Sequence, residues 1–131
     1  MKQSCIFCDI LKDNKNIIYQ TDKMFVLFDR YPRSNSHFLI IPKEHSPHLT
    51  TVKDNDLSET ILLAKRIAQF LGMNSYNICQ NNVFGQIINH FHLHLIEANE
   101  SGNVLSEEKD LDQNEYEKIV KEKTLLFRDL Y

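Results

Sequence analysis

Cysteine is scarce in this chain of 131 residues, and several other features are missing that would place it in a particular class. Its three cysteines are an odd number and do not make the disulfide framework of a small secreted protein. No apolar run approaches the length of a membrane span, and Met1 to Cys5 lack the apolar core of a signal peptide. We therefore expect a cytoplasmic protein without a membrane partner.

An excess of positive charge is also missing. The chain has 15 Lys and Arg against 18 Asp and Glu, a net charge of -3, so it has no broad basic field to hold a nucleic acid polymer. No repeat, low-complexity segment or dividing linker interrupts it. A chain of this length can bury about two thirds of its unfolded surface, so we expect residues 1–131 to form one domain.

Apolar periodicity outlines the secondary structure. It predicts strands at residues 17–19, 24–28, 37–41, 76–80 and 88–96, the first two as a hairpin. A helix is expected over residues 54–71, capped by Asp54 or Asn55 and ended by Gly72, with the apolar stripe Leu57, Ile61, Ala64, Ala68 and Leu71. A second helix is expected from Asp112 to about Leu130. The pattern predicts an α+β fold: an antiparallel sheet of about five strands, one central helix and a C-terminal helix.

The most informative stretch is His90-Phe91-His92-Leu93-His94-Leu95-Ile96. A strand would place its three histidines in one row, about 6.6 Å apart, with the apolar residues on the other face. A helix would turn His92 away from the other two and split the apolar set. Imidazole serves as nucleophile, proton carrier or metal ligand near neutral pH, so the row predicts a reactive or metal-binding site. A merely solvated strand face would more often carry Thr, Lys or Glu.

A second chemical feature is Cys5-Ile6-Phe7-Cys8. Such a pair can hold zinc or exchange thiols, but a redox pair usually opens a helix after a buried strand, and no strand precedes this one. A structural zinc needs two more ligands, and spacing alone leaves several histidines open: His37, His45, His48 and the row itself. Ordinary small core residues are the plain alternative. Cys79, inside an expected strand, is expected to be buried.

The histidine row resembles the signature of the histidine triad (HIT) family, and further segments resemble the same family in order. Cys5–Ile10 is similar to its N-terminal segment, Leu27–Asp29 and His37–His45 to its central strands, and Gln80–Gln86 to the loop before the triad. The similarity covers residues 4 to 96.

This resemblance implies an α+β homodimer that binds a purine nucleotide and cleaves a bond at its α-phosphate through a covalent nucleotidyl-histidine. His92 matches the nucleophile, and neutral imidazole is competent in that role at pH 7. His94 matches a residue that donates to the phosphoryl oxygens or protonates the leaving group. Backbone N–H groups around Gln86 and Ile87 are further candidate donors.

The resemblance also implies substrate contacts. Asp29 matches the acid that binds the ribose hydroxyls, Asn82 an asparagine near the leaving group, Gln86 a residue of the phosphate loop, and His37 a fourth histidine that supports the site. The apolar base pocket is matched by Ile6, Phe7, Ile10 and Leu27, for which plain core packing is an equal alternative. Glu97 follows the triad, and its charge would repel a long polyphosphate. A nucleoside phosphoramidate or a small adenylylated substrate is therefore favoured over a long dinucleotide polyphosphate.

Family members with this cysteine pair bind zinc through it, through a histidine after the central strand and through the first triad histidine. The matching set is Cys5, Cys8, His48 and His90, with His45 as the alternative to His48. A closed set of this kind is structural. One rival interpretation is a zinc-stabilised nucleotide-binding module with little turnover, although binding alone would not need the nucleophile. Thiol redox activity is another, and it would leave the triad unexplained.

Overall fold

The computed structural model describes residues 5–98 and 107–130 and has an antiparallel five-stranded sheet in the order β1-β2-β3-β5-β4. The elements in chain order are α1 (Ile6–Asp13), β1 (Tyr19–Gln20), β2 (Met24–Phe28), β3 (His37–Pro42), α2 (Asp54–Phe70), β4 (Tyr76–Cys79), β5 (Leu93–Glu97), α3 (Gln113–Leu126) and a 3₁₀ turn (Phe127–Asp129). The predicted fold class is confirmed. Among the described residues, no helix is both long and apolar enough to cross a bilayer.

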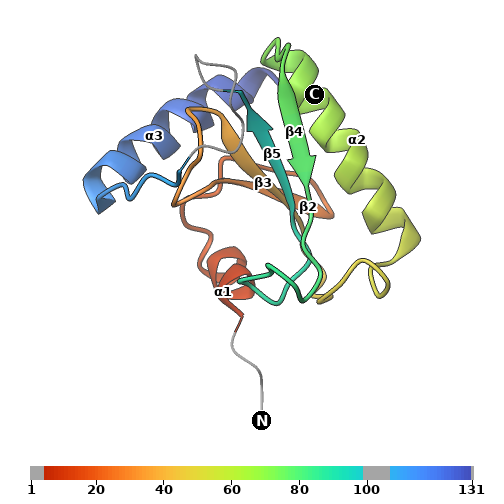
Figure 1. The fold of residues 1–131 in the computed structure, drawn as a ribbon. Helices are drawn as coiled ribbons and strands as arrows, with labels where there is room; N and C mark the ends of the chain where they lie inside the picture. Colours follow the sequence, from red (N-terminus) through yellow and green to blue (C-terminus); the bar gives the residue numbers. More distant parts are fainter. Residues whose placement is uncertain (1–4, 99–106, 131) are drawn as a thin grey trace.

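Both faces of the central strands are covered, which explains why β2 and β3 are buried along their whole length. One face packs against α2 and α3, and α1 lies apart from these helices on the other face (Figure 1). On the α1 face, Phe7 packs with Phe25, Leu27, Leu39 and Ile41. His94 pairs with Leu39 across β5 and β3, and directly opposed residues share a face. The last triad histidine therefore lies on the α1 side of the sheet.

Strand β5 begins later than the sequence predicts. The expected strand over residues 88–96 is Leu93–Glu97 in the structure. Before it the chain bends: His90 N–H donates to the Ile88 carbonyl, and Phe91 N–H donates to the Ser46 carbonyl at 2.7 Å. These bonds hold the segment against the chain that leaves β3, outside the strand ladder. Only His94 of the triad therefore belongs to a strand.

The buried face of α2 also differs from the predicted stripe. Its buried apolar residues are Leu63, Ala64, Ile67 and Ala68, whereas Ile61 is 45% exposed. The predicted cap is wrong as well, because Lys53 holds the cap position without a side-chain bond and Asp54 already lies in the first turn. An acid there still interacts favourably with the helix dipole. The helix is followed, as predicted, by a glycine, Gly72, at φ +64.

Helix α3 begins as predicted, with the Asp112 carboxylate accepting the N–H of Glu115 at 2.8 Å. Two further features differ from what the sequence indicated: one was not predicted, and one was predicted wrongly. Residues 6–13 form a helix that the sequence interpretation did not include, and its N-cap, Cys5, accepts the N–H of Cys8 through Sγ. Cys79 is exposed because β4 is an edge strand.

Candidate active site

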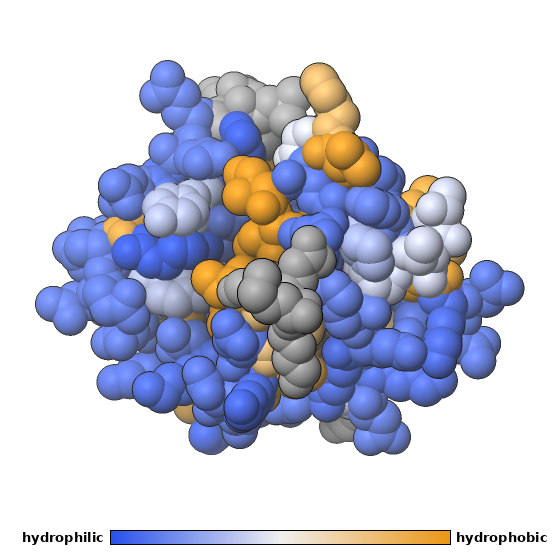
Figure 2. Space-filling view, turned by 90° about the horizontal axis from the view of Figure 1, so that it is seen from below, coloured by the Kyte–Doolittle hydropathy of each residue, from blue (hydrophilic) through white to orange (hydrophobic). Residues whose placement is uncertain are grey.

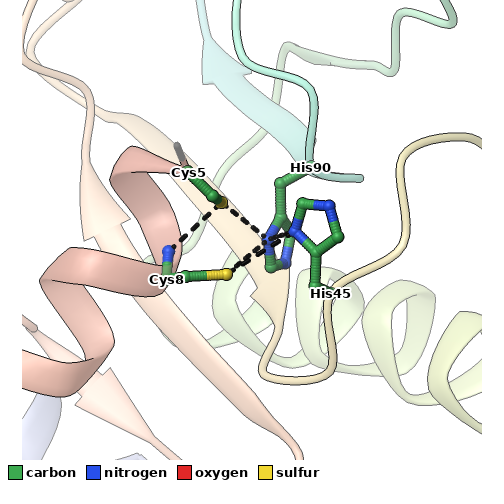
Figure 3. Close-up of side chains that lie close together, drawn as sticks. All are labelled: Cys5, Cys8, His45 and His90. Atoms are coloured by element: carbon green, nitrogen blue, oxygen red, sulfur yellow. Dashed lines mark hydrogen bonds between the residues drawn. The ribbon is translucent and has the colours of Figure 1, made fainter. Parts of the chain in front are cut away.

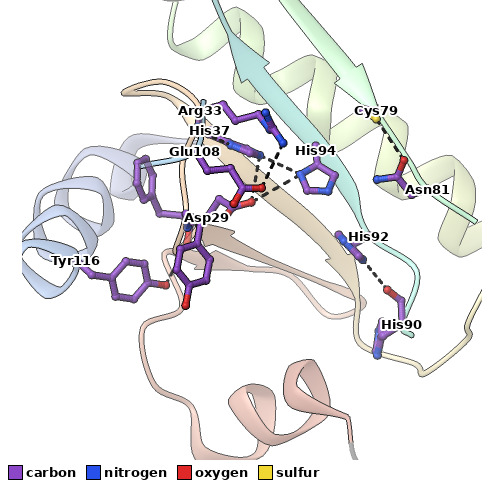
Figure 4. Close-up of polar contacts among 12 residues, drawn as sticks. Asp29, Arg33, His37, Cys79, Asn81, His90, His92, His94, Glu108 and Tyr116 are labelled. Atoms are coloured by element: carbon purple, nitrogen blue, oxygen red, sulfur yellow. Dashed lines mark hydrogen bonds and ion pairs between the residues drawn. The ribbon is translucent and has the colours of Figure 1, made fainter. Parts of the chain in front are cut away.

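The three triad histidines lie in two neighbouring clusters of polar side chains. The first cluster contains His92 and His94, whose ring centroids are 5.0 Å apart, together with His37 and Asp29 (Figure 4). The ring of His90 points to the other group, formed with the N-terminal cysteines (Figure 3). The predicted single row is thus divided between two sites, because the chain bends before β5 starts.

His92 is held in one tautomer by its own chain. Its Nδ1 lies 2.7 Å from the His90 carbonyl oxygen, which can only accept, so Nδ1 carries the proton and Nε2 keeps its lone pair. Burial lowers the pKa of His92, which keeps the ring neutral. Within residues 5–98 and 107–130, every fully buried side-chain nitrogen has a hydrogen-bond partner, whereas His92 Nε2 has none. His92 Nε2 is therefore not fully buried, and its lone pair remains accessible to a ligand.

His94 belongs to a cluster with His37 and Asp29. His37 Nε2 lies 2.9 Å from His94 Nδ1 and 3.2 Å from Asp29 Oδ2 (Figure 4). Burial lowers the pKa of His94 to about 4 and that of His37 to about 3. Both rings are therefore neutral near pH 7.

Asp29, at the end of β2, accepts the N–H of Tyr31 at 2.8 Å through Oδ1. Burial raises its pKa to about 6, against the opposite effect of the Tyr31 bond. An ion pair of Arg33 and Glu108, 3.2 Å long, brings the segment before α3 to this cluster (Figure 4). Asp29 is therefore a largely ionised acceptor near pH 7, in a site bordered by the loop after β2 and the segment before α3.

The second group brings together Cys5, Cys8, His45 and His90 (Figure 3). Its Sγ–Nδ1 distances are 3.4 Å (Cys5–His90), 3.5 Å (Cys8–His45) and 3.7 Å (Cys8–His90), and the two Nδ1 atoms are 3.0 Å apart. A tetrahedral zinc separates sulfur from nitrogen by about 3.6 Å and two nitrogens by about 3.3 Å, given bonds of about 2.3 and 2.05 Å. The donor set therefore fits such an ion with small movements.

The tautomer of His90 also suits a metal. Its Nε2 donates to the Pro42 carbonyl at 2.8 Å, so the lone pair is on Nδ1, the atom that faces the cysteines. Burial and a hydrogen bond with Cys5 raise the pKa of the Cys8 thiol to about 11. Reactive thiols have lowered pKa values, so the environment of Cys8 does not favour thiol exchange, whereas a bound metal would itself deprotonate the thiol.

The geometry favours His45 over His48 as the fourth member. The bond from Phe91 N–H to the Ser46 carbonyl places the residues just after β3 beside His90, and the rings of His45 and His90 are 4.8 Å apart. His48 instead lies in a turn, where its N–H donates to Thr51 Oγ1. Two residues after the Ser46 contact, the chain has already turned away from the cysteines.

Asp29, His37 and His94 are also close enough to hold a metal by distance alone. The backbone N–H of Arg33 donates to His37 Nδ1 at 3.1 Å, so the neutral ring of His37 carries its proton on Nε2, the atom that faces the other two residues. A protonated nitrogen cannot coordinate a metal. The group with the cysteines is therefore the better metal site among the described residues.

A family model described as the HIT domain matches residues 11–101. The chain belongs to the histidine triad family. It is 33% identical over 127 residues to an uncharacterized HIT-like protein of Methanocaldococcus jannaschii, covering 89% of this chain and 98% of that one. It is 35% identical over 97 residues to an adenosine 5'-monophosphoramidase of Saccharomyces cerevisiae, covering 71% of this chain and 61% of the yeast protein. A Zn-bound histidine triad protein of Mycobacterium smegmatis has a TM-score of 0.75 at 26% identity, covering 95% and 96% of the two chains.

Two loop residues that the HIT resemblance assigns to substrate are engaged within the protein. The Asn82 side chain accepts the N–H of Leu49 at 2.7 Å, and the side-chain amides of Asn82 and Gln80 form two hydrogen bonds with each other. The Gln86 side chain donates to the Pro47 carbonyl at 2.7 Å and accepts the N–H of Val83. Both side chains close the loop onto the segment after β3, so a direct contact with substrate would require these bonds to open. The backbone N–H of Gln86 is bound to the Val83 carbonyl as well.

The four residues matched to the HIT base pocket divide by burial. Phe7 and Leu27 belong to the core cluster under α1, Ile10 packs at its border, and Ile6 is 53% exposed. On the molecular face seen from below, apolar surface forms a central band between hydrophilic areas (Figure 2). The rings of Phe7 and His92 meet edge to face with centroids 5.0 Å apart. Phe7 is thus both a core residue and a neighbour of the triad.

Sequence reasoning missed the partners that distinguish these HIT histidines. The sequence carries no signal for the backbone N–H of Arg33 or for the Pro42 carbonyl, because main-chain contacts do not depend on residue type. It carries none for the Arg33–Glu108 ion pair either, because Glu108 lies far along the chain. A helical signal at α1 was available in the spacing of Phe7, Ile10 and Leu11.

Proposed function

We propose that this protein is a nucleotide hydrolase or nucleotidyl transferase that cleaves a bond at the α-phosphate of a purine nucleotide, with a nucleoside phosphoramidate as the preferred substrate class. The observation that carries this proposal is the bond from His92 Nδ1–H to the His90 carbonyl, which leaves the Nε2 lone pair free beside His94. Relatives named as adenosine 5'-monophosphoramidases, in two yeasts at 33–35% identity, support the substrate class. A relative named adenylylsulfatase, from Arabidopsis thaliana, supports attack at an adenylyl group.

The proposed reaction has two displacements. His92 Nε2 attacks phosphorus, and the bond from phosphorus to the leaving nitrogen breaks, with its electron pair going to that nitrogen, which takes up a proton from solvent. Water then attacks phosphorus and gives up a proton to solvent, the bond from phosphorus to Nε2 breaks with its electron pair returning to Nε2, and the nucleoside monophosphate is released. Dividing the displacement lowers each barrier. In this scheme His94 donates to the phosphoryl oxygens, where charge develops, and Asp29 accepts from the ribose hydroxyls.

We further propose that Cys5, Cys8, His45 and His90 hold one structural zinc. Four protein ligands leave no open coordination position, so the ion would supply cross-linking and no chemistry. It would tie α1 to the segment that carries the triad. The bond from His90 Nε2 to the Pro42 carbonyl supports this assignment, since metal-ligating histidines ordinarily donate their second N–H to a carbonyl or carboxylate.

A homodimer is the proposed assembly. Strand β4 lies at the edge of the sheet with every residue exposed, and Tyr76 and Ile78 are about half exposed. Among the described residues no further strand lies beside its outer edge, so its backbone groups could pair with the same strand of a second copy. Light scattering during size-exclusion chromatography should give twice the mass of the chain, and a stable monomer at micromolar concentration would contradict the proposal.

The nucleophile assignment can be tested with adenosine 5'-phosphoramidate. We expect His92→Ala to lower kcat by at least about a thousandfold, because it removes the attacking atom. His92 is buried, so thermal unfolding of the variant measures the packing that is lost with its ring. Intact-protein mass spectrometry of quenched wild type should detect an adenylyl adduct that is missing from His92→Ala. His48→Ala, which lies outside both polar groups, is the matched control.

Two results would contradict the proposal in different ways. A tenth of wild-type activity in His92→Ala would mean that another residue is the nucleophile. Tight binding of adenosine monophosphate without turnover of phosphoramidates or dinucleotides would support the nucleotide-binding module instead.

A further inference from the structure

We propose that His37 is a positioning residue that determines which nitrogen of His94 carries the proton, so that His94 presents an N–H to the phosphoryl group beside the nucleophile. This inference rests on the proposed function for the identity of that ligand. The tautomers themselves follow from contacts within the chain, so they can be tested without substrate.

The first step is the tautomer of His37. The backbone N–H of Arg33 donates to His37 Nδ1 at 3.1 Å, and an amide N–H can only donate. Nδ1 must therefore hold a lone pair, and the neutral ring carries its proton on Nε2. The side chain is only 2% exposed, and burial keeps its pKa near 3, so the doubly protonated form is absent near pH 7.

The second step transfers this constraint to His94. His37 Nε2 lies 2.9 Å from His94 Nδ1, and two N–H groups cannot face each other at that distance. His94 Nδ1 must therefore accept, which leaves the proton of the neutral ring on Nε2. Asp29 Oδ2, 3.2 Å from His37 Nε2, shares the same N–H and does not compete for His94.

The two adjacent triad histidines are thus held in opposite tautomers. His92 has its proton on Nδ1, bound to the His90 carbonyl, whereas His94 has its proton on Nε2. With the rings 5.0 Å apart, one ring offers a lone pair and the other an N–H. A phosphoryl group needs both, since its phosphorus is attacked while its oxygens accept hydrogen bonds.

Loss of the His37 donor should reverse the tautomer of His94. Asp29 Oδ2 lies 3.7 Å from His94 Nδ1, the next acceptor in reach. Without the N–H of His37, a proton on His94 Nδ1 could bind that carboxylate after a small movement. His94 would then turn a lone pair toward the phosphoryl oxygens and repel them.

Two substitutions at position 37 separate donation from simple packing. His37→Asn can accept the Arg33 N–H but has no group at the Nε2 position, whereas His37→Gln can place its amide N–H near that position. We expect kcat for adenosine 5'-phosphoramidate to fall about a hundredfold in His37→Asn and no more than about tenfold in His37→Gln, with smaller changes in KM. Thermal unfolding of both variants measures the packing loss that they share.

The direct readout is a long-range proton–nitrogen NMR correlation of the uniformly labelled, metal-loaded protein. The wild type should have the His94 proton on Nε2, and His37→Asn should move it to Nδ1. A wild-type spectrum with the proton on Nδ1 overturns the proposal, even if neither variant folds. An unchanged His94 tautomer in His37→Asn, or equal kcat losses in the two variants, also overturns it. If wild type has the expected tautomers but cleaves no nucleotide, the proposed function fails while the role of His37 in orienting His94 stands.

Discussion

Substitution of His45 should remove the proposed zinc, whereas substitution of His48 should not. The donor atoms of Cys5, Cys8, His45 and His90 already lie within 4.8 Å of one another, so binding requires little rearrangement of the folded chain. His45→Ala removes one of four ligands. We expect purified wild type to contain about one zinc per chain and His45→Ala to contain little.

The expected effect on stability follows from linkage. A ligand that binds only the native state stabilises it by about 4 kcal/mol when its free concentration is a thousandfold above Kd. For a chain of this length that corresponds to a rise in Tm of roughly 12–20 °C. The His45→Ala variant and the double variant Cys5→Ser, Cys8→Ser should both lose most of this difference, and a chelator should lower the Tm of wild type alone.

Elemental analysis and scanning calorimetry measure these two quantities on the same samples. Cys79→Ser is the matched control for removing a thiol, because Cys79 lies in β4 outside the group, and His48→Ala is the control for removing an imidazole. Activity should survive in part, since His92 and His94 are not proposed ligands. Zinc-free wild type would refute the site, and zinc retained by His45→Ala but lost by His48→Ala would refute its fourth ligand. Loss of all activity in folded, zinc-free protein would contradict a purely structural ion.

Two further predictions concern the cluster around Asp29. Asp29→Asn should weaken adenosine monophosphate binding by about 1–3 kcal/mol in calorimetry, while the 2',3'-dideoxy analogue should be less affected; equal losses would mean that Asp29 does not bind the ribose. Burial lowers the pKa of His37 from 6.5 to about 3, so below pH 6.5 the unfolded chain takes up a proton that the folded chain does not. The contribution of His37 to the free energy of unfolding is fully present above pH 6.5 and is lost as the pH falls toward 3, by about 2 kcal/mol between pH 7 and 5. Urea unfolding at pH 7 and pH 5 should give a smaller decrease in the free energy of unfolding for His37→Gln than for wild type. Equal decreases would contradict a neutral, buried His37 in the folded chain.

The sequence predicted the elements with strong local patterns. Strand β2 and the Asp112 cap of α3 agree with the structure, because a turn between apolar runs and a capping carboxylate act within a few residues. The buried face of α2 was misjudged because two apolar sets, one through Ile61 and one through Leu63 and Ile67, share the helix. The sheet selects between them, and a helical period alone cannot.

The triad marks the limit of local reasoning more clearly. Alternation identified three histidines as one chemical feature, but the structure gives each a different partner: the Pro42 carbonyl for His90, the His90 carbonyl for His92, and His37 for His94. These partners are 48, 2 and 57 residues away in sequence.

A partner on one imidazole nitrogen determines what the other nitrogen can do, so each contact also assigns a role. His90 can face a metal, His92 can attack, and His94 can donate. Only the contact that prepares His92 is short enough to be read from the motif itself. The roles of His90 and His94 depend on partners in β3, Pro42 and His37. The spacing of the motif therefore indicates reactivity, whereas the tertiary fold determines which role each of the three histidines has.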